Sequence, residues 1–256
     1  MSPSAPESPD ARRRSEKTLA FRLLSFVVLP FMNLLGKYVL HGTEHVPKQG
    51  AFVLAPNHLS NIDPLVVAVA LWNAGRAPRF LGKASLFRIP VVGGILRATG
   101  QIPVERSGAT RNGPDPLAAA NMIVDKGLAV IIYPEGTLTR QPELWPMRGK
   151  TGAVRTALSQ GIPVIPVAHW GVQKILPRYS KKLSLFPRKR VDILFGPAVD
   201  LSRFEGRALD AATLSEATEQ VMRDITGLLE QLRGETAPAE RWDPVKHGQA
   251  ETGRFE

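Results

Sequence analysis

The sequence contains no cysteine and no apolar run long enough to span a membrane. Without cysteine, the chain of 256 residues has no disulfide, no thiolate nucleophile and no cysteine-ligated zinc. Its most apolar region reads TLAFRLLSFVVLPFMNLLGKYVL, but the uncharged run covers residues 23–36 and contains Pro30. A spanning helix needs about 20 apolar residues, and proline interrupts helical hydrogen bonding. The composition therefore excludes thiol chemistry and a simple transmembrane span.

Acidic residues are too few to balance the basic ones, with 23 Asp and Glu against 33 Lys and Arg, a formal charge of +10. This excess suits an anionic partner such as nucleic acid, a membrane surface or a phosphorylated substrate. The sequence has no dinucleotide-binding glycine fingerprint, nucleophile-elbow serine or histidine pair at metal-ligand spacing. MRGKT, residues 147–151, matches the end of a phosphate-binding loop, but Leu144 occupies its first glycine position. No metal ligand is therefore predicted.

One basic stretch contains an aromatic residue. It is YSKKLSLFPRKR, residues 179–190. Basic patches with aromatic residues can bind nucleic acid, but the sequence has no signature of a nucleic-acid-binding fold. A membrane-facing or solvated basic loop is the preferred interpretation, and no nucleic-acid partner is expected.

The N-terminal region predicts a disordered segment followed by a membrane anchor. Residues 1–17 are rich in Ser, Pro and charge, which predicts disorder. Residues 18–40 predict a pair of helices broken near Pro30 and lying in the membrane interface. Apolar burial and attraction of the arginines at 12–14 to anionic lipid would act together there. The alternative is a helical hairpin that packs on the protein's own core.

Between residues 41 and 233, strand-like and helix-like segments alternate. Short apolar segments predict strands at 51–55, 79–82, 101–104, 129–133, 163–168 and 191–196. Helices are predicted at 64–74, 117–126, 149–159 and 214–232. This alternation predicts a single α/β domain with a mixed, mostly parallel sheet flanked by helices and preceded by the helix pair. The polar residues 234–256 predict a disordered tail.

The stretch APNHLSNIDPL, residues 55–65, joins the first predicted strand to the first predicted helix. Such crossings hold ligands in α/β proteins. Five positions apart on one helix, His58 and Asp63 would point apart, so they meet only if the chain turns between them. Asp63 as N-cap and Pro64 as the next residue predict a helix start after that turn. His58 could then take a proton from a hydroxyl, although a core histidine and a capping aspartate are the alternative interpretations.

The segment NHLSNIDP, residues 57–64, resembles the NHxxxxD signature of the glycerophospholipid acyltransferase superfamily. Three further blocks follow in that family's order: GKASLFRIPVVGGILRATGQIPVER (82–106), YPEGTLTR (133–140) and GIPVIPVAHWG (161–171). The resemblance covers residues 42–197 and is strongest to the bacterial 1-acyl-sn-glycerol-3-phosphate acyltransferases. It implies transfer of a fatty acyl group to the free hydroxyl of lysophosphatidate, giving phosphatidate.

The resemblance implies that His58 is the general base and that Asp63 supports it. The hydroxyl then attacks the thioester of acyl-CoA or acyl carrier protein directly, so the family needs no cofactor and no covalent acyl-enzyme. The residues that the resemblance assigns to substrate binding are Lys83, Arg106, Glu135, Gly136 and Thr137. Arg106 is expected to hold the acceptor's phosphate, because a guanidinium fork matches phosphate oxygens. Lys83 is a candidate for a second phosphate contact.

Three positions depart from the family pattern. Ser85 stands where an acidic residue is usual, Pro103 replaces a large apolar residue, and Leu138 replaces an arginine that Arg140 could supply. These departures leave open another lysophospholipid or a glycolipid as acceptor. A non-catalytic lipid-binding protein of the same fold is the alternative outside enzymes. The expected partners are the membrane surface with its anionic lipids, the acyl donor and the acceptor, and the expected location is peripheral or monotopic on the cytoplasmic face of the cell membrane.

Overall fold

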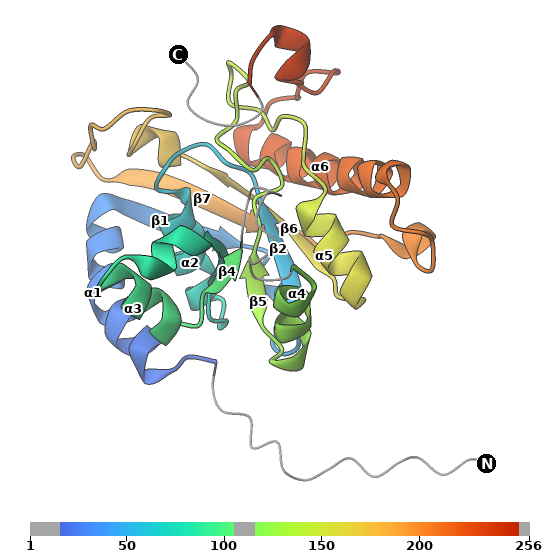
Figure 1. Cartoon of the computed structure of the whole chain (residues 1–256). Helices are drawn as coiled ribbons and strands as arrows, with labels where there is room; N and C mark the ends of the chain where they lie inside the picture. Colours follow the sequence, from blue (N-terminus) through green and yellow to red (C-terminus); the bar gives the residue numbers. More distant parts are fainter. Residues whose placement is uncertain (1–15, 105–115, 251–256) are drawn as a thin grey trace.

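The computed structural model describes residues 16–104 and 116–250, and Figure 1 shows a central sheet between layers of helices. Seven strands lie in the order β1-β7-β6-β2-β5-β3-β4. Their bounds are β1 (Gly36–His41), β2 (Phe52–Pro56), β3 (Arg79–Lys83), β4 (Ile102–Val104), β5 (Ala129–Ile131), β6 (Val164–Trp170) and β7 (Lys189–Phe195). Neighbouring strands are parallel except β6 and β7, which are antiparallel. The predicted α/β fold with a mixed, mostly parallel sheet is confirmed.

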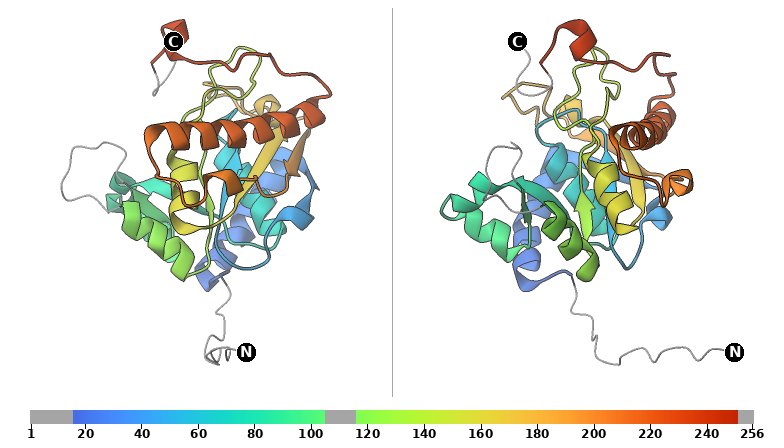
Figure 2. Two further views of the ribbon diagram at one scale, coloured as in Figure 1. Left: turned by 90° about the vertical axis from the view of Figure 1, so that its right-hand side faces the viewer. Right: turned by 45° about the vertical axis from the view of Figure 1, so that its right-hand side comes forward.

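Helices cover both faces of this sheet (Figure 2). The α-helices of the described residues are α1 (Leu19–Leu35), α2 (Asp63–Asn73), α3 (Val92–Ala98), α4 (Pro116–Asp125), α5 (Gly152–Gln160) and α6 (Ala211–Arg233). Short 3-10 helices are η1 (Thr43–His45), η2 (Ala84–Arg88), η3 (Val172–Lys174), η4 (Ser202–Phe204) and η5 (Val245–His247). The helices α1 and α2 lie on one face, and α5 and α6 lie on the other.

The central strand β2 shows why this layering forms. Its side chains alternate, so that Phe52 and Leu54 pack with α1 and α2 while Val53 and Ala55 pack with α5 and α6. All four residues are fully buried. A strand that is apolar on both faces must be covered on both, which explains the position of β2 inside the sheet.

The predicted helix pair over residues 18–40 is wrong, because α1 is one helix that contains Pro30 and β1 follows it directly. Proline removes one helical hydrogen bond, whereas Met32 and Leu35 beyond it are fully buried in the core. Burying each such side chain stabilises the fold by about 1.5–3 kcal/mol, which offsets the lost bond. In residues 16–104 and 116–250 we find no helix with the length and apolar character needed to cross a bilayer.

The prediction of a disordered tail does not hold for residues 234–250, which pack along α6. Arg241 contacts the carboxylate of Glu219 at 3.3 Å, and the backbone carbonyl of Trp242 accepts the N–H of Arg148 at 2.8 Å. The sequence is polar there, but its polar groups have partners on α6 and on the segment before α5. The disorder predicted for residues 1–17 is wrong at its last two positions, because Glu16 binds Arg76 and Lys17 donates to the carbonyl of Trp72. The remaining predicted disorder, at residues 1–15 and 251–256, lies outside the described residues.

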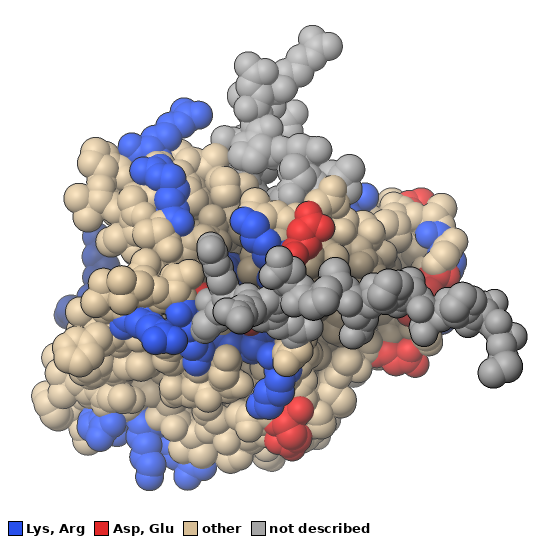
Figure 3. Space-filling view, turned by 90° about the horizontal axis from the view of Figure 1, so that it is seen from below, with Lys and Arg blue, Asp and Glu red and all other residues tan. Residues whose placement is uncertain are grey.

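The basic residues have two different environments. On the face seen from below in Figure 3, groups of Lys and Arg stand out from a mainly uncharged surface, and Asp and Glu are fewer. Arg76 and Arg79 are instead buried, and both bind the carboxylate of Glu16, at 2.5 and 3.2 Å. Arg76 also donates to the backbone carbonyls of Gly50 and Gly127. These two arginines therefore stabilise the fold, while some exposed ones, such as Arg190 and Arg207, pair with surface carboxylates.

Candidate active site

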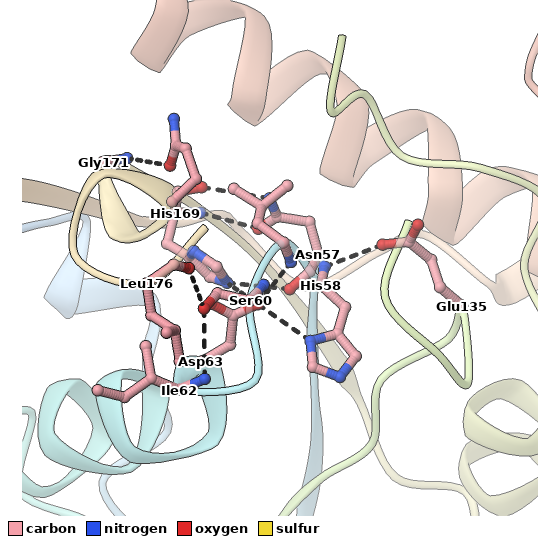
Figure 4. Close-up of polar contacts among 11 residues, drawn as sticks. Asn57, His58, Ser60, Ile62, Asp63, Glu135, His169, Gly171 and Leu176 are labelled. Atoms are coloured by element: carbon pink, nitrogen blue, oxygen red, sulfur yellow. Dashed lines mark hydrogen bonds and ion pairs between the residues drawn. The ribbon is translucent and has the colours of Figure 1, made fainter. Parts of the chain in front are cut away.

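His58 and Asp63 meet in the turn between β2 and α2, at the carboxyl end of β2 (Figure 4). The Nδ1 atom of His58 donates to Oδ2 of Asp63 at 3.0 Å. The same carboxylate oxygen accepts the backbone N–H groups of Leu59 at 2.5 Å and Ser60 at 2.8 Å. The predicted contact between the two side chains is therefore present, and the Asp63 carboxylate itself closes the turn.

Asp63 occupies a different position in the helix from the one predicted. It is the first residue of α2, while Ile62 is the N-cap and provides no side-chain cap. The carboxylate turns back toward residues 58–60, because three donors of the preceding turn converge on it. Its side chain is completely buried, and a buried charge is stable only when such donors surround it. The predicted capping role is therefore wrong, and Asp63 instead holds His58.

His58 is the partly accessible member of the pair, with 15% of its side chain exposed. Its ring stacks on Tyr133 with the two centroids 4.2 Å apart. Since Nδ1 carries the proton shared with Asp63, the lone pair lies on Nε2, to which no described residue donates. Burial, together with the negative charge of Asp63, raises the pKa of Tyr133 well above its usual value, so this phenol stays neutral. The arrangement leaves Nε2 as a proton acceptor with a fixed orientation.

Glu135 connects the turn of His58 to a second loop. One carboxylate oxygen accepts the backbone N–H of His58 at 2.9 Å, and the other accepts that of Met147 at 3.1 Å. Burial raises the pKa of Glu135 to about 8, although hydrogen bonds from Met147, His58 and Thr139 oppose this shift. The observed contacts of Glu135 are thus internal to the protein, and its implied binding of the acceptor stays a prediction.

The remaining predicted residues are only partly gathered here. Gly136 follows Glu135 with a left-handed φ of +70°, and a Cβ atom on it would come within 3.1 Å of the Lys150 side chain. Thr137 comes next and is half-buried. Lys83 ends β3, which β5 separates from β2. Arg106 lies outside the described residues. Of the predicted site residues, the structure brings His58, Asp63 and Glu135 into direct contact.

Sequence reasoning missed two residues that support the pair. The side chain of Asn57 bonds to both backbone groups of His169 on β6, accepting its N–H at 2.9 Å and donating to its C=O at 3.2 Å. In return, Nε2 of His169 donates to the carbonyl of Asn57 at 3.0 Å and lies 3.7 Å from Oδ2 of Asp63. Burial lowers the pKa of His169, so its ring is neutral. The position of His169 within the apolar block GIPVIPVAHWG could have indicated a buried histidine near the site.

An apolar pocket of about 320 Å³ lies between α1, α2 and the segment from β3 to α3. The helix α2 forms one wall with Leu65, Ala68, Val69 and Trp72. Leu65 is two residues from Asp63, so the pocket begins close to the turn that holds His58. No group of His, Asp and Glu suited to a metal ion occurs within residues 16–104 and 116–250.

Comparison with known proteins connects this geometry to one family. The model of the acyltransferase family matches residues 37–170. The chloroplast 1-acyl-sn-glycerol-3-phosphate acyltransferase BAT2 of Brassica napus is 30% identical over 200 residues, which are 77% of this chain and 55% of that protein. The enzyme of that name from Bacillus subtilis is 25% identical over 78% of this chain and 94% of its own length. The chain thus spans about half the length of the plant relative and nearly all of the bacterial one.

Among solved structures, the 1-acyl-sn-glycerophosphate acyltransferase of Thermotoga maritima has a similar fold. The TM-score is 0.62 at 22% sequence identity, and the superposition covers 87% of this chain and 83% of that one. The matched family region contains the turn of His58, the YPEG segment and β6, which together form the polar cluster. Since the family model matches more than half of the 256 residues, the chain belongs to the acyltransferase family.

Proposed function

We propose that this protein is a 1-acyl-sn-glycerol-3-phosphate acyltransferase. It would transfer a fatty acyl group from acyl-CoA or acyl carrier protein to the free hydroxyl of lysophosphatidate. The names of the relatives from Brassica napus and Bacillus subtilis support this acceptor. The observation that carries the proposal is the contact between His58 and Asp63, which leaves Nε2 of His58 as a partly exposed base.

The proposed reaction is a direct acyl transfer. Nε2 of His58 takes the proton of the acceptor hydroxyl while the hydroxyl oxygen attacks the thioester carbonyl carbon. The positive imidazolium is stabilised by the carboxylate of Asp63, which already accepts the Nδ1 proton. The carbon–sulfur bond then breaks, and the leaving thiolate takes the proton from Nε2. His58 returns to its neutral form, and the ester product is released.

The apolar pocket beside α2 is the proposed site of the acyl chain. Its volume of about 320 Å³ and its apolar lining from α1, α2 and α3 suit a flexible hydrocarbon chain. The pocket starts at Leu65, close to Asp63, so a thioester carbonyl could lie near His58 while its chain extends between the helices. The length of this pocket would then limit chain length.

The outward face of α1 is the proposed membrane contact, on the cytoplasmic face of the cell membrane. It exposes Leu23, Phe26, Val27 and Phe31, and Arg22 stands beside them. Apolar side chains with a neighbouring cation suit the interface of an anionic leaflet. A deletion through Tyr38 would remove α1 but also part of β1, and so could unfold the sheet. Single substitutions on the outward face of α1 therefore test the membrane contact more directly.

The acceptor is tested by measuring acyl transfer of the parent and Arg106→Ala on lysophosphatidate and lysophosphatidylcholine. A bidentate contact to the terminal phosphate predicts a severe loss for Arg106→Ala on lysophosphatidate, partial rescue in Arg106→Lys, and a much smaller loss on lysophosphatidylcholine. Equal losses on both acceptors would show that Arg106 does not bind the acceptor's terminal phosphate.

Two other outcomes would change the proposed function. Preference of the parent for a phosphate-free or glycosylated acceptor would replace lysophosphatidate by that acceptor and retain acyl transfer by His58. Absence of transfer to every acceptor, with retained lipid binding, would favour a lipid-binding protein. The substitutions at Ser85, Pro103 and Leu138 relative to the family pattern make the acceptor panel the decisive measurement.

A further inference from the structure

The 181–188 loop, KKLSLFPR, presents apolar and basic side chains to solvent together. Phe186 is 72% exposed and Leu183 is 46% exposed. Lys181 and Lys182 are exposed as well, and neither forms an ion pair with a described residue. An exposed aromatic ring next to free ammonium groups matches the boundary of an anionic leaflet, where rings enter the acyl region and cations meet headgroups.

The loop lies beside the end of α1. The strands β1 and β7 pair in parallel from their first residues, Gly36 and Lys189, so the segments that enter them are neighbours. Arg188 fixes this arrangement by donating from Nη2 to the carbonyl of Gly36 at 3.0 Å. Leu34, just before β1, and Phe186, just before β7, are both exposed. Figure 1 shows the loop at the upper left and α1 at the left of the molecule.

The loop also belongs to the edge of the sheet that holds His58. Because β7 runs antiparallel to β6, its first residues lie at the carboxyl ends of β6 and β2. The backbone N–H of Ser184 donates to the carbonyl of Ile175 at 2.8 Å. The hydroxyl of Ser60, in the turn of His58, donates to the next carbonyl, that of Leu176, at 2.6 Å. The loop and the catalytic turn are thus tied to the same short segment.

Exposed apolar side chains occur mainly on three segments, one of which is this loop. Within the described residues, the large exposed ones gather on α1, on the segment from η2 to α3, and on the 181–188 loop. The exceptions are Leu65, Val124 and Val245. The helix α1 lies between the other two segments, since it lines one pocket with α3 and its end lies beside the 181–188 loop. Such a gathering of exposed apolar residues marks an interaction surface.

We propose that the 181–188 loop is a second membrane-contacting element, which binds an anionic leaflet next to α1. Phe186 and Leu183 enter the apolar boundary, and Lys181 and Lys182 contact the headgroups. This inference rests on the proposed membrane role of α1, but it concerns a separate segment that can be changed independently. The proposed partner is lipid, because the exposed apolar residues of the loop lie beside lysines that form no ion pair with a described residue.

A fluorescent label tests the contact directly. Because the chain has no cysteine, Leu183→Cys and Val124→Cys can each carry one polarity-sensitive dye. Val124 is exposed on α4, away from α1 and the loop, and serves as the matched control. Vesicles of phosphatidylglycerol and phosphatidylcholine should shift the emission at position 183 to the blue and leave position 124 unchanged. An unchanged emission at position 183 on vesicles that bind the protein would overturn the proposal.

Vesicle sedimentation separates the loop from α1. Phe186→Ser should weaken binding about tenfold, and Lys181→Glu with Lys182→Glu should weaken it about tenfold on anionic vesicles but little on pure phosphatidylcholine. Leu183→Ser provides a second apolar variant if Phe186→Ser unfolds. Phe26→Ser on α1 tests the proposed function, and Val124→Ser should bind like the parent.

The pattern of losses distinguishes the two proposals. Parental binding by every loop variant, with a loss in Phe26→Ser, overturns the role of the loop and leaves that of α1. Parental binding by Phe26→Ser, with losses in the loop variants, overturns the anchor on α1 and supports the loop. Activity on detergent-dispersed acceptor should be the same for the parent and the loop variants, which shows that these variants remain folded.

Discussion

The two ends of α2 have opposite chemical environments. Its first residue, Asp63, is a fully buried carboxylate whose Oδ2 accepts three hydrogen bonds from the preceding turn. Two turns further on, Ala68, Val69 and Trp72 face an apolar pocket. One helix therefore connects a polar cluster that can stabilise a positive imidazolium with a pocket that can hold a hydrocarbon chain. The comparison predicts that proton transfer and acyl-chain binding can be damaged separately.

His58→Ala should cause the largest loss, on the polar side alone. Removing a general base lowers the rate by about 10² to 10⁴, while the apolar pocket stays intact. We therefore expect acyl transfer to be abolished and acyl-CoA binding, measured by calorimetry, to remain within about twofold. Circular dichroism serves as the folding control. Near-parental turnover in a folded variant would refute the role of His58.

His169→Leu should lower kcat by about tenfold, because the Asn57 carbonyl loses its donor and Asp63 loses a neighbouring N–H dipole. Because the backbone and carboxylate that hold His58 are then less firmly fixed, kcat should fall while KM changes little. His169→Gln keeps a donor and should recover most of kcat. A loss of stability with an unchanged kcat would mean that His169 supports the fold alone.

Ala68→Phe should act on the apolar side. The added ring would fill part of the pocket, so the ratio of kcat/KM for a long acyl donor to that for a short one should fall about tenfold, since each methylene is worth about 1–3 kcal/mol in a hydrophobic site. Ala212→Phe, at an exposed position early in α6, is the matched control. An equal loss on all donors would place the acyl chain elsewhere.

Glu135→Gln should change catalysis least, and its effect should appear in the pH dependence of stability. Burial raises the folded pKa of Glu135 to about 8 from 4.5, so the folded state binds more protons between these pH values and becomes less stable as pH rises. The glutamine variant lacks this decline. This linkage is worth about 4 kcal/mol between pH 5 and 9, so we expect the difference in Tm between parent and variant to change by about 10 °C over that range. Parallel curves would contradict the raised pKa.

The internal strands could be predicted from the sequence because burial on both faces gives a continuous apolar run, as in β2. The edge strand β1 could not, since GKYVLH mixes charged and apolar residues and is defined by its pairing with β7, far along the chain. The helix α3 was missed for a local reason. Its sequence VGGILRA contains two glycines, which weaken the helical signal.

The contact between His58 and Asp63 could be predicted from six residues of sequence, because a short turn before a helix brings them together. Their environment could not. The hydrogen bonds of Glu135 to His58 and of His169 to Asn57 join segments more than 70 residues apart. Nothing in the local pattern indicates that a glutamate oxygen will meet a backbone N–H of another block, so these supports required the structure.

The antiparallel pairing of β6 and β7 has a consequence for how the protein would meet the proposed acceptor. It brings the chain that enters β7, the end of α1 and the turn of His58 to one edge of the sheet. A protein resting on a leaflet by this edge would find its acceptor by lateral diffusion in two dimensions. Its rate would then follow the mole fraction of acceptor in the surface, and diluting that surface with inert lipid would slow turnover at constant bulk concentration.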